Sequence, residues 1–509
     1  MRTVMRQSLP LLIFVCWLCC PGLDARAVEP PAVTVMPQAG FNLAIQEQIS
    51  PSYVIVQLTS PLHNWFAGTF TNLTTTGEMT IGISMEGNDT EGNKGDVRKW
   101  DGLKPAMTYA DPTQYAAYES FTRTPQGVWM SDDPLKAGEA GNAGTGAVPR
   151  QTVIPPQVAE QFLSADGNYW SPWREIDTVE LVPNVNIFRM KQHFTLPTAT
   201  IAMRVPFSCQ YLQAFLKQLQ ILRLPGVTVE NAGFSAAHRA LPVICLEDAD
   251  PPADGKSRPT ILLIAGEHAT EPAGSWAAFG LLKHLLSLPV TSPLRRDIRW
   301  MLLPIEDPDG RAAALFDHLT DQFCQTTEGY PEVLAYTRYL SDFSFSTNRP
   351  IDIVVNLHNV EANEGPNLFS PVADFREKED IAEVNRLCYT RLRQQGYQVA
   401  NTDLPEDIER VFRSRLYGWC TCSLASLDIV FEVNDRYPRH RLTLAETQYI
   451  GRALGESLWG FYDSADGQRR HQQACRVFAA RALERARYFT SVHRTPATRT
   501  PFDVIGQGF

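Results

Sequence analysis

The pattern of apolar and polar positions divides the chain into two parts. From about Val33 to Arg204 short segments alternate in polarity or run apolar between turn residues, as in Tyr53–Leu58 and Met79–Met85. Further segments of this kind are Val179–Pro183, Ile187–Met190 and Ala199–Arg204. No strand–helix alternation interrupts them, and this pattern predicts an all-β sandwich.

The pattern changes at about Phe207, where strand-like runs begin to alternate with helical stretches. We expect helices at Tyr211–Ile221, Gly274–Ser287, Asp380–Gln395 and Leu444–Phe461. Such alternation predicts an α/β domain with a mostly parallel mixed sheet flanked by helices. An Arg-rich helix at Gln468–Tyr488 follows, and we expect it to dock on that domain, a binding arm being the alternative.

The N-terminus has the features of a signal peptide. Arg2 and Arg6 precede an apolar core, Leu9–Cys20, and Ala25-Arg26-Ala27 supplies small residues for cleavage. The core is shorter than the roughly 20 residues that span a bilayer, and no later stretch is long enough. We therefore expect a secreted or periplasmic protein with no integral membrane segment after cleavage, an uncleaved anchor being the alternative.

These patterns together predict four segments. They are a signal peptide (1–27), a β-sandwich domain (28–205), a catalytic domain (206–465) and an Arg-rich C-terminal helix and tail (466–509). The net charge of -10 argues against nucleic acid as a partner, because phosphate binding needs a basic face. Seven of the ten cysteines follow the signal peptide, and we interpret them mainly as buried structural residues.

Four apolar runs in the second part end on residues that can do chemistry. Ile261–Gly266 is followed by Glu267–Glu271, Ile351–Leu357 by His358, and Leu427–Phe431 by Glu432. The fourth run, Trp300–Pro304, precedes Asp307-Pro308-Asp309-Gly310. Open α/β sheets bind ligands beyond the carboxyl ends of their strands. The chain is therefore predicted to be a metallohydrolase.

His268, Glu271 and His358 are the candidate metal ligands. The spacing of His268 and Glu271 at a helix start lets both side chains face one centre, and His358 supplies a third ligand. Two imidazoles and a carboxylate are a common donor set for catalytic Zn²⁺, which keeps an open position for water. The His-x-x-Glu spacing is weak evidence by itself; its place after a buried strand strengthens it.

Glu432 is the candidate general base. A carboxylate beside an activated water can accept its proton and pass it to the leaving group. Because the apolar residues Ile429-Val430-Phe431 precede it, Glu432 is expected to be buried and therefore paired or functional. An ion pair with Arg436 is the alternative.

These motifs resemble those of the zinc metallocarboxypeptidases, in order and over roughly Phe207–Asp463. The matching segments are Gly266–Gly274, Asp307–Gly310, Asn356-Leu357-His358, Phe431-Glu432-Val433 and Ala232–Arg239. The N-terminal part, with Asn64-Trp65-Phe66, Leu103–Met107 and Trp170–Arg174, is similar to the leading domain of the cytosolic-carboxypeptidase-like branch. The resemblance implies a β-sandwich before an α/β catalytic domain and a peptide or protein substrate.

The chain departs from the family in the region that holds the substrate carboxylate. Its only Asn-Arg pair between Gly310 and His358 is Asn348-Arg349, which lies directly before the strand of His358 and is more typical of a turn. We consider Arg311 for the oxyanion or carboxylate, with Arg413, Arg415 and Tyr417 as further substrate-binding candidates. A surface helix is an equal interpretation of the last three.

The predicted function is zinc-dependent hydrolysis of a C-terminal peptide amide bond by metal-activated water, with Glu432 as the base and an arginine, Arg311, at the oxyanion. Two alternatives remain. One is an amidase or deacylase of aspartoacylase-like type, acting on a non-peptide or envelope amide. The other is an exported binding protein whose catalytic half is degenerate.

Overall fold

The computed structural model describes most of the chain between residues 31 and 492. The described ranges are 31–59, 65–85, 96–100, 103–109, 121–123, 129–131, 169–170, 173–247, 258–315, 318–319, 330–359, 367–369, 377–397, 399, 416–424, 426–433 and 442–492. The predicted signal peptide, Arg413, Arg415, Arg436 and the tail after residue 492 lie outside them.

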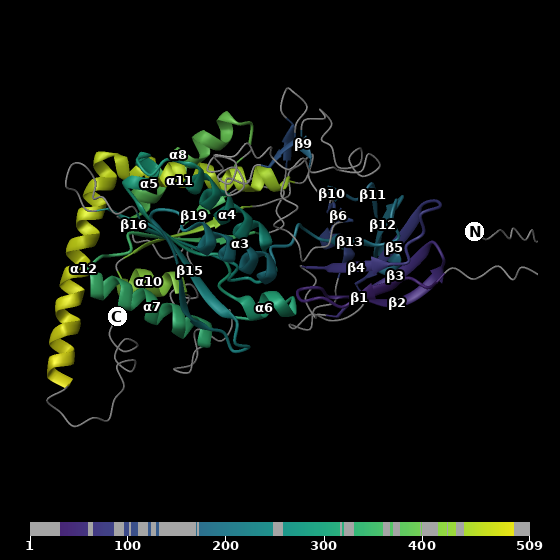
Figure 1. Cartoon of the computed structure of the whole chain (residues 1–509), viewed down its shortest axis with the longest axis horizontal. Helices are drawn as coiled ribbons and strands as arrows, with labels where there is room; N and C mark the ends of the chain where they lie inside the picture. The colour runs from purple at the N-terminus through teal and green to yellow at the C-terminus, as the bar shows by residue number, and fades with distance from the viewer. Residues whose placement is uncertain are drawn as a thin grey trace, which may run out of the picture. The chain divides into compact units, whose positions relative to one another are not determined.

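The N-terminal part is built from two five-stranded sheets (Figure 1). The first has the order β1 (Thr34–Met36), β4 (Ala67–Thr71), β13 (Ala199–Ala202), β6 (Ala106–Thr108) and β10 (Arg174–Glu175). The second has the order β11 (Thr178–Val182), β12 (Ile187–Gln192), β5 (Met79–Ser84), β3 (Tyr53–Leu58) and β2 (Leu43–Ser50). All pairings are antiparallel except β3 with β5. A small antiparallel sheet has the order β8 (Trp129–Ser131), β7 (Phe121–Arg123) and β9 (Tyr169–Trp170).

Aromatic side chains form the core of this β-rich part. Phe66 directly precedes β4, Phe188 lies on β12 of the other sheet, and Trp100 ends a short 3-10 helix, η1 (Val97–Trp100). The ring of Trp100 is 5.1 Å from that of Phe66 and 5.4 Å from that of Phe188. Tilted and edge contacts of this kind add to the burial of apolar area. The prediction of a preceding β domain is confirmed.

The second part contains one seven-stranded mixed sheet. Its order is β14 (Val227–Phe234), β15 (Ala240–Leu246), β17 (Arg299–Leu303), β16 (Thr260–Ala265), β18 (Ile353–His358), β20 (Leu427–Glu432) and β19 (Asn367–Phe369). The four strands β17, β16, β18 and β20 run parallel, while the pairings at both edges are antiparallel. The strands predicted from the four apolar runs are therefore the parallel centre of the sheet.

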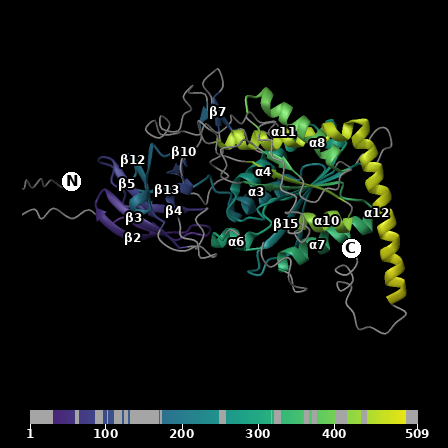
Figure 2. The same ribbon diagram turned by 180° about the vertical axis from the view of Figure 1, so that it is seen from behind.

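Helices cover both faces of this sheet (Figure 2). On one face α4 (Pro272–Ser287) contacts β16 and β18, and α11 (Leu444–Asp463) packs against α4 and α8 (Glu377–Gln394). On the other face α7 (Pro331–Thr347) and α10 (Leu416–Leu424) contact each other, and α10 contacts β18 and β20. The remaining helices include α3 (Cys209–Leu222), α5 (Pro293–Arg296), α6 (Pro308–Ala313), α12 (Ala465–Val492) and η3 (Pro183–Val185). The predicted α/β architecture is confirmed.

Alternation along the central strands explains the two layers of helices. On β16, Ile261 and Leu263 are buried in the core on the α4 side, whereas Leu262 and Ile264 are buried in the core that contains residues of α7 and α10. Successive side chains of a strand point to opposite faces, so a strand covered on both sides must be apolar throughout. That is why the segment Ile261–Ala265 of β16 has no polar position.

The Arg-rich helix α12 is anchored to the sheet domain. Phe478 of α12 is buried and stacks on Phe345 of α7 with ring centroids 5.0 Å apart. His471 lies 2.6 Å from Asp352, which directly precedes β18. Within the described residues, no helix is long and apolar enough to cross a membrane.

The expected domain boundary near residue 205 falls between β13 and α3. Buried apolar side chains from both sides of it belong to one continuous cluster. The division into domains therefore stays a prediction.

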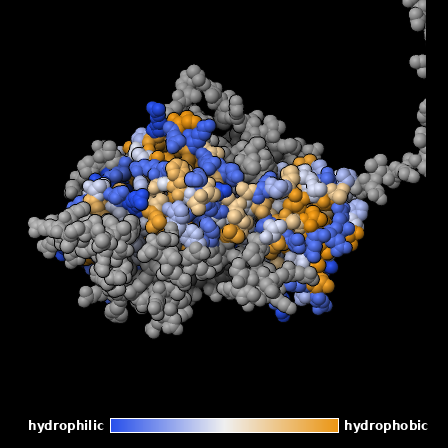
Figure 3. Space-filling view, turned by 90° about the horizontal axis from the view of Figure 1, so that it is seen from below, coloured by the Kyte–Doolittle hydropathy of each residue, from blue (hydrophilic) through white to orange (hydrophobic). Residues whose placement is uncertain are grey.

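On the face shown in Figure 3, hydrophobic and hydrophilic residues are interspersed between the grey regions.

Candidate metal centre

The loop after β16 places two of the predicted ligands. Gly266 directly follows β16 with φ of +71°, a left-handed conformation that favours glycine. The backbone N–H of Glu271 donates to the carbonyl of His268 at 3.1 Å, and Glu271 directly precedes α4, whose first residue is Pro272. This turn brings the side chains of His268 and Glu271 to the same side, as their spacing predicts.

His358 completes the cluster from the end of the neighbouring strand β18. Its Nδ1 lies 3.1 Å from Nδ1 of His268 and 3.0 Å from Oε2 of Glu271. Nδ1 of His268 lies 2.9 Å from Oε1 of Glu271. The structure thus brings together the three predicted ligands, whose donor atoms all lie within 4.8 Å of one another.

This arrangement fits a zinc ion. With Zn–N distances of about 2.0–2.1 Å, neighbouring donors of a tetrahedral site are separated by about 3.3 Å. Two imidazole nitrogens that face each other at 3.1 Å need a proton or a cation between them. The side chains of Glu271 and His358 are 5% and 4% exposed, but that of His268 is 15% exposed. The cluster therefore keeps one accessible side.

The electrostatics of the cluster keep its carboxylate ionised. Although burial opposes the charged form, the imidazoles of His268 and His358 hold the pKa of Glu271 well below its ordinary value. Burial likewise opposes a charge on His358, but Glu267 and Glu271 raise its pKa well above the ordinary value. A group of residues that attracts a proton this strongly can also attract a divalent cation.

Two residues beside the ligands have roles that the sequence did not indicate. Oε2 of the buried Glu267 lies 3.4 Å from Nε2 of His358, on the side of the ring away from the cluster. The amide of Asn356 donates to Glu267 and also lies 2.8 Å from the same ring nitrogen. Partners of this kind fix the orientation of a ligating histidine. Glu267 directly precedes His268 in the sequence, and Asn356 lies two positions before His358. This proximity to the ligands was the signal from which their roles could have been predicted.

Glu432 lies beside the cluster. It ends β20, and its Cα pairs with that of His358 in the parallel register of β18 and β20. Paired residues of adjacent strands point to the same face of the sheet, so Glu432 and His358 share a face. Glu432 is only partly buried. A carboxylate in this position can act on a molecule held at the cluster.

The Asp-Pro-Asp-Gly turn after β17 is hydrogen-bonded to the loop that follows β14. Asp307 accepts from the N–H of Gly310 at 2.7 Å and caps α6. Asp309 accepts from the hydroxyl of Ser235 at 2.7 Å and from Nη1 of Arg239 at 2.5 Å. Through these bonds the turn Asp307–Gly310 holds the loop after β14 in place. They explain why the chain has both the Asp307–Gly310 segment and the Ala232–Arg239 segment.

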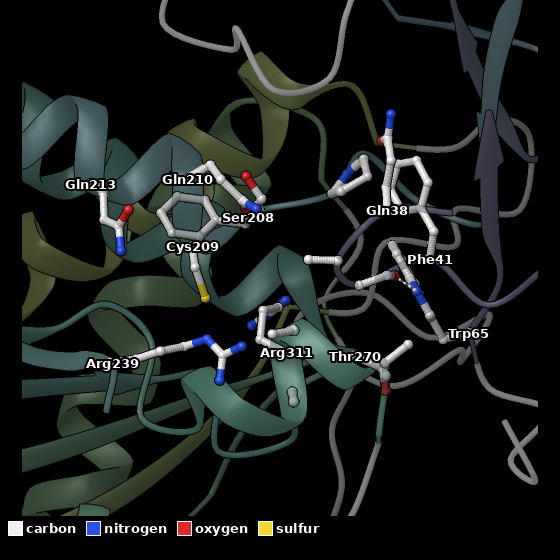
Figure 4. A pocket seen from close by; sticks show the side chains of 17 residues that line it. Gln38, Phe41, Trp65, Ser208, Cys209, Gln210, Gln213, Arg239, Thr270 and Arg311 are labelled. Carbon is white, nitrogen blue, oxygen red and sulfur yellow. Dashed lines mark hydrogen bonds between the residues drawn. The ribbon is translucent and has the colours of Figure 1, made fainter. Parts of the chain in front are cut away.

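Among the remaining candidates, Arg311 has a side chain that the structure describes. Arg311 is buried in α6 and lines a pocket with Arg239 and Cys209 (Figure 4). His268, Glu271 and His358 are not among the residues that line this pocket. Tyr417 is in α10, and its side chain is outside the described part of the chain. The predicted roles of these residues, and those of Arg413 and Arg415, stay predictions.

Asn348-Arg349 is at the opposite end of β18 from His358. Asn348 ends α7 in a left-handed conformation, and Arg349 donates to Glu247 at 3.1 Å. The interpretation of this pair as a turn before a strand is confirmed.

Comparison with known proteins supports the resemblance. Residues 212–322 match the family described as zinc carboxypeptidase. A metallo-carboxypeptidase from Burkholderia cenocepacia has a similar structure, with 14% identity, a TM-score of 0.58 and an alignment over 85% of this chain and 99% of that one. A metallo-carboxypeptidase from Pseudomonas aeruginosa in complex with (2-guanidinoethylmercapto)succinic acid aligns over the same shares with 13% identity and a TM-score of 0.58.

At these identities the structural likenesses show a shared fold. The predicted resemblance to zinc metallocarboxypeptidases is confirmed, and the chain is a carboxypeptidase-like hydrolase. The narrower resemblance to the cytosolic-carboxypeptidase-like branch stays a prediction.

Proposed function

We propose that the chain is a zinc-dependent carboxypeptidase that hydrolyses the C-terminal amide bond of a peptide or protein. The observation that carries this proposal is the convergence of Nδ1 of His268, Nδ1 of His358 and the carboxylate of Glu271 at 2.9–3.1 Å. The match of residues 212–322 to the zinc carboxypeptidase family supports it.

Each residue of the site has a separate role in the proposed reaction. His268, Glu271 and His358 would hold a zinc ion, which would supply Lewis acidity to polarise a carbonyl and to lower the pKa of water to about 7. Glu432, on the strand next to His358, accepts a proton from the attacking water and returns it to the leaving amine. Glu267 keeps the ring of His358 oriented so that Nδ1 faces the cluster.

Glu432→Gln tests the proposed base. The amide has nearly the same shape as the carboxylate but cannot accept the proton, so we expect kcat to fall by about 10²–10⁴-fold. Zinc content, measured by elemental analysis, should be unchanged. Glu379→Gln, an exposed position of α8, is the matched control and should have wild-type kcat. A variant Glu432→Gln with wild-type activity would remove the base from the mechanism.

The requirement for a free C-terminus distinguishes a carboxypeptidase from an amidase. A peptide and its C-terminally amidated form should be compared under identical conditions by mass spectrometry of the products. We expect cleavage of the free acid only, because the proposed enzyme must bind the terminal carboxylate. Equal cleavage of both peptides would favour an amidase or deacylase, and zinc binding without hydrolysis of any amide would favour a binding protein.

We further propose that the protein is exported. Arg2, Arg6 and the apolar core Leu9–Cys20 support this proposal. N-terminal sequencing of the protein from its native host should give a mature chain that begins near Val28. An intact Met1 in the cytoplasmic fraction would contradict it.

A further inference from the structure

Helix α12 carries a cysteine beside the ion pair that anchors it to the sheet. Sγ of Cys475 lies 3.8 Å from Nε2 and 4.0 Å from Nδ1 of His471, one helical turn earlier. Nδ1 of His471 lies 2.6 Å from Oδ1 of Asp352, which directly precedes β18. We call these three side chains the thiol cluster. It is at the opposite end of β18 from His358 and is therefore separate from the candidate metal centre.

Asp352 holds the imidazole of His471 in place. Its Oδ2 accepts from the backbone N–H of Thr260 at 2.8 Å, and its Oδ1 is directed to Nδ1 of His471. A carboxylate bonded to one ring nitrogen fixes the orientation of a histidine. Because Sγ of Cys475 is almost equally far from both ring nitrogens, the sulfur contacts the ring as a whole.

The imidazole beside the sulfur is a cation at neutral pH. Burial opposes its charge, but Asp352 and Cys475 raise the pKa of His471 to about 10. The interaction between two titrating groups is one coupling energy that both share. A thiolate that stabilises the imidazolium is therefore stabilised by it in return. The thiolate is the nucleophilic form of cysteine, and histidine cations are a common cause of reactive thiols.

Cys475 can also be reached from solvent. Within the described residues five cysteines are free thiols, and they are Cys209, Cys245, Cys388, Cys420 and Cys475. Cys388 and Cys420 are buried, whereas the other three are partly exposed. Burial raises the pKa of Cys209 and raises that of Cys245 to about 11, so both stay protonated at neutral pH. These two partly exposed thiols are internal references for Cys475.

The other charged groups around the thiol cluster have partners of their own. Arg470 of α12 lies 3.7 Å from Asp380 of α8. Further along α12, Arg481 donates to the backbone carbonyl of Thr421 in α10 at 3.2 Å. Tyr462 of α11 stays protonated, because burial raises its pKa well above the ordinary value. In the part of the chain that the structure describes, the imidazolium is thus the charged group within hydrogen-bonding distance of the sulfur.

We propose that Cys475 is a reactive thiol that hydroperoxides oxidise, with His471 as the positioning residue that stabilises its thiolate. The sulfur attacks one oxygen of hydrogen peroxide, the O–O bond breaks, and hydroxide leaves with the electron pair of that bond. The sulfur loses two electrons and becomes a sulfenic acid, and both peroxide oxygens are reduced. Hydroxide takes up the proton that the thiol had released and becomes water. This modification does not involve the proposed hydrolytic site.

Rates of alkylation test the reactivity of the thiol on the full-length, zinc-loaded protein. Iodoacetamide should be added at pH 7 to the native protein and to protein unfolded in urea, and labelling followed at each cysteine by mass spectrometry. We expect Cys475 to react faster in the native protein, because folding places it beside a cation. Cys209 and Cys245 should react more slowly in the native protein, because burial shields them and keeps them protonated.

Two matched substitutions identify the partner of the thiol. His471→Gln removes the positive charge and should slow native labelling of Cys475 about tenfold, since loss of one adjacent opposite charge changes an ionised fraction by about this factor or more. His284→Gln, in which the histidine pairs with Glu456 at 3.4 Å on another helix, is the control and should keep the wild-type rate. Circular dichroism should verify the fold of both variants. The comparison of native with unfolded wild type does not depend on either variant.

Trapping of the sulfenic acid tests the oxidation itself. Wild-type protein should be treated with hydrogen peroxide and then with dimedone, which forms a stable adduct with sulfenic acids. We expect an adduct at Cys475 and almost none at Cys209 or Cys245, and much less at Cys475 in His471→Gln.

Three outcomes would overturn the proposal. They are native labelling of Cys475 that is no faster than in the unfolded protein, a wild-type rate in folded His471→Gln, and absence of a dimedone adduct at Cys475 after peroxide. None of these measurements depends on catalysis. The proposal can therefore fail while the proposed hydrolase stands, and the reverse also holds.

Discussion

Strand β18 has a cluster of histidine and carboxylate groups at each end, and the two clusters differ in kind. At its carboxyl end His358 meets His268 and Glu271. At its beginning the buried Asp352 lies 2.6 Å from the buried His471. Residue types and burial are similar, so composition alone does not distinguish a metal centre from a structural ion pair.

The difference is in how each cluster satisfies its own groups. Asp352 pairs with His471 and also accepts from the N–H of Thr260 at 2.8 Å, and this joins α12 to the start of the sheet. Burial opposes a charge on His471, but Asp352 and Cys475 raise its pKa to about 10. The pair is therefore an imidazolium with a carboxylate, and it needs no further cation. At the other end two imidazole nitrogens face each other and need a proton or a cation between them.

This comparison teaches which observation indicates a metal. Histidines and carboxylates near one another are common in ion pairs, whereas several lone pairs that converge on one point are stabilised by a cation. The location supports the same conclusion, because the carboxyl ends of parallel strands are where such sheets bind ligands. The following predictions test the distinction.

Loss of a ligand should have the largest effect. His358→Ala removes one of three zinc donors, and we expect zinc affinity to fall by more than the ~100-fold typical for loss of an outer partner. Elemental analysis should find about one zinc per chain in the wild type and almost none in the variant. His471→Gln, at the other end of β18, should retain the metal. Equal zinc loss in both variants would contradict the comparison.

Breaking the structural pair should lower stability instead. Asp352→Ala leaves a buried imidazolium without its partner, and we expect the free energy of unfolding to fall by about 3–5 kcal/mol. Urea denaturation followed by circular dichroism would measure the change. Zinc stoichiometry in the folded protein should remain that of the wild type. A stable variant that has lost zinc would mean that the roles of the two clusters are reversed.

Removal of an outer partner should weaken the metal site moderately. Glu267→Gln keeps the shape but removes the charge that faces Nε2 of His358, and zinc affinity should fall by about 10–100-fold. Competition with a chelator would measure this. Glu379→Gln is again the matched surface control. Wild-type affinity in Glu267→Gln would show that Glu267 has only a packing role.

The smallest expected effect is a dependence of stability on pH. Because the folded protein holds the pKa of His471 at about 10, above its ordinary value of 6.5, the contribution of this residue is complete below pH 6.5 and is lost as pH rises through 10. The difference in free energy of unfolding between wild type and His471→Gln should therefore shrink between pH 7 and pH 10. A constant difference would show that the imidazolium does not contribute.

Much of the fold could be predicted because the signals are local. Apolar runs gave the strands β16, β17, β18 and β20 to within one or two residues, and the spacing of His268 and Glu271 gave the turn that orients them. The three ligands could be predicted together because parallel strands end at the same edge of a sheet. The edge strands were harder, since the antiparallel pairing of β19 with β20 depends on a neighbour and not on its own three residues.

The sequence by itself determined the strand-like segments, the helical periods and the ligand types, because each is a property of a few neighbouring residues. Tertiary structure decided which polar residues acquired partners. Asp352 and His471 are 119 positions apart, and no pattern in either segment indicates their pairing. Burial and partnership depend on three-dimensional packing, and that is why the sequence could suggest the chemistry but only the fold could locate it.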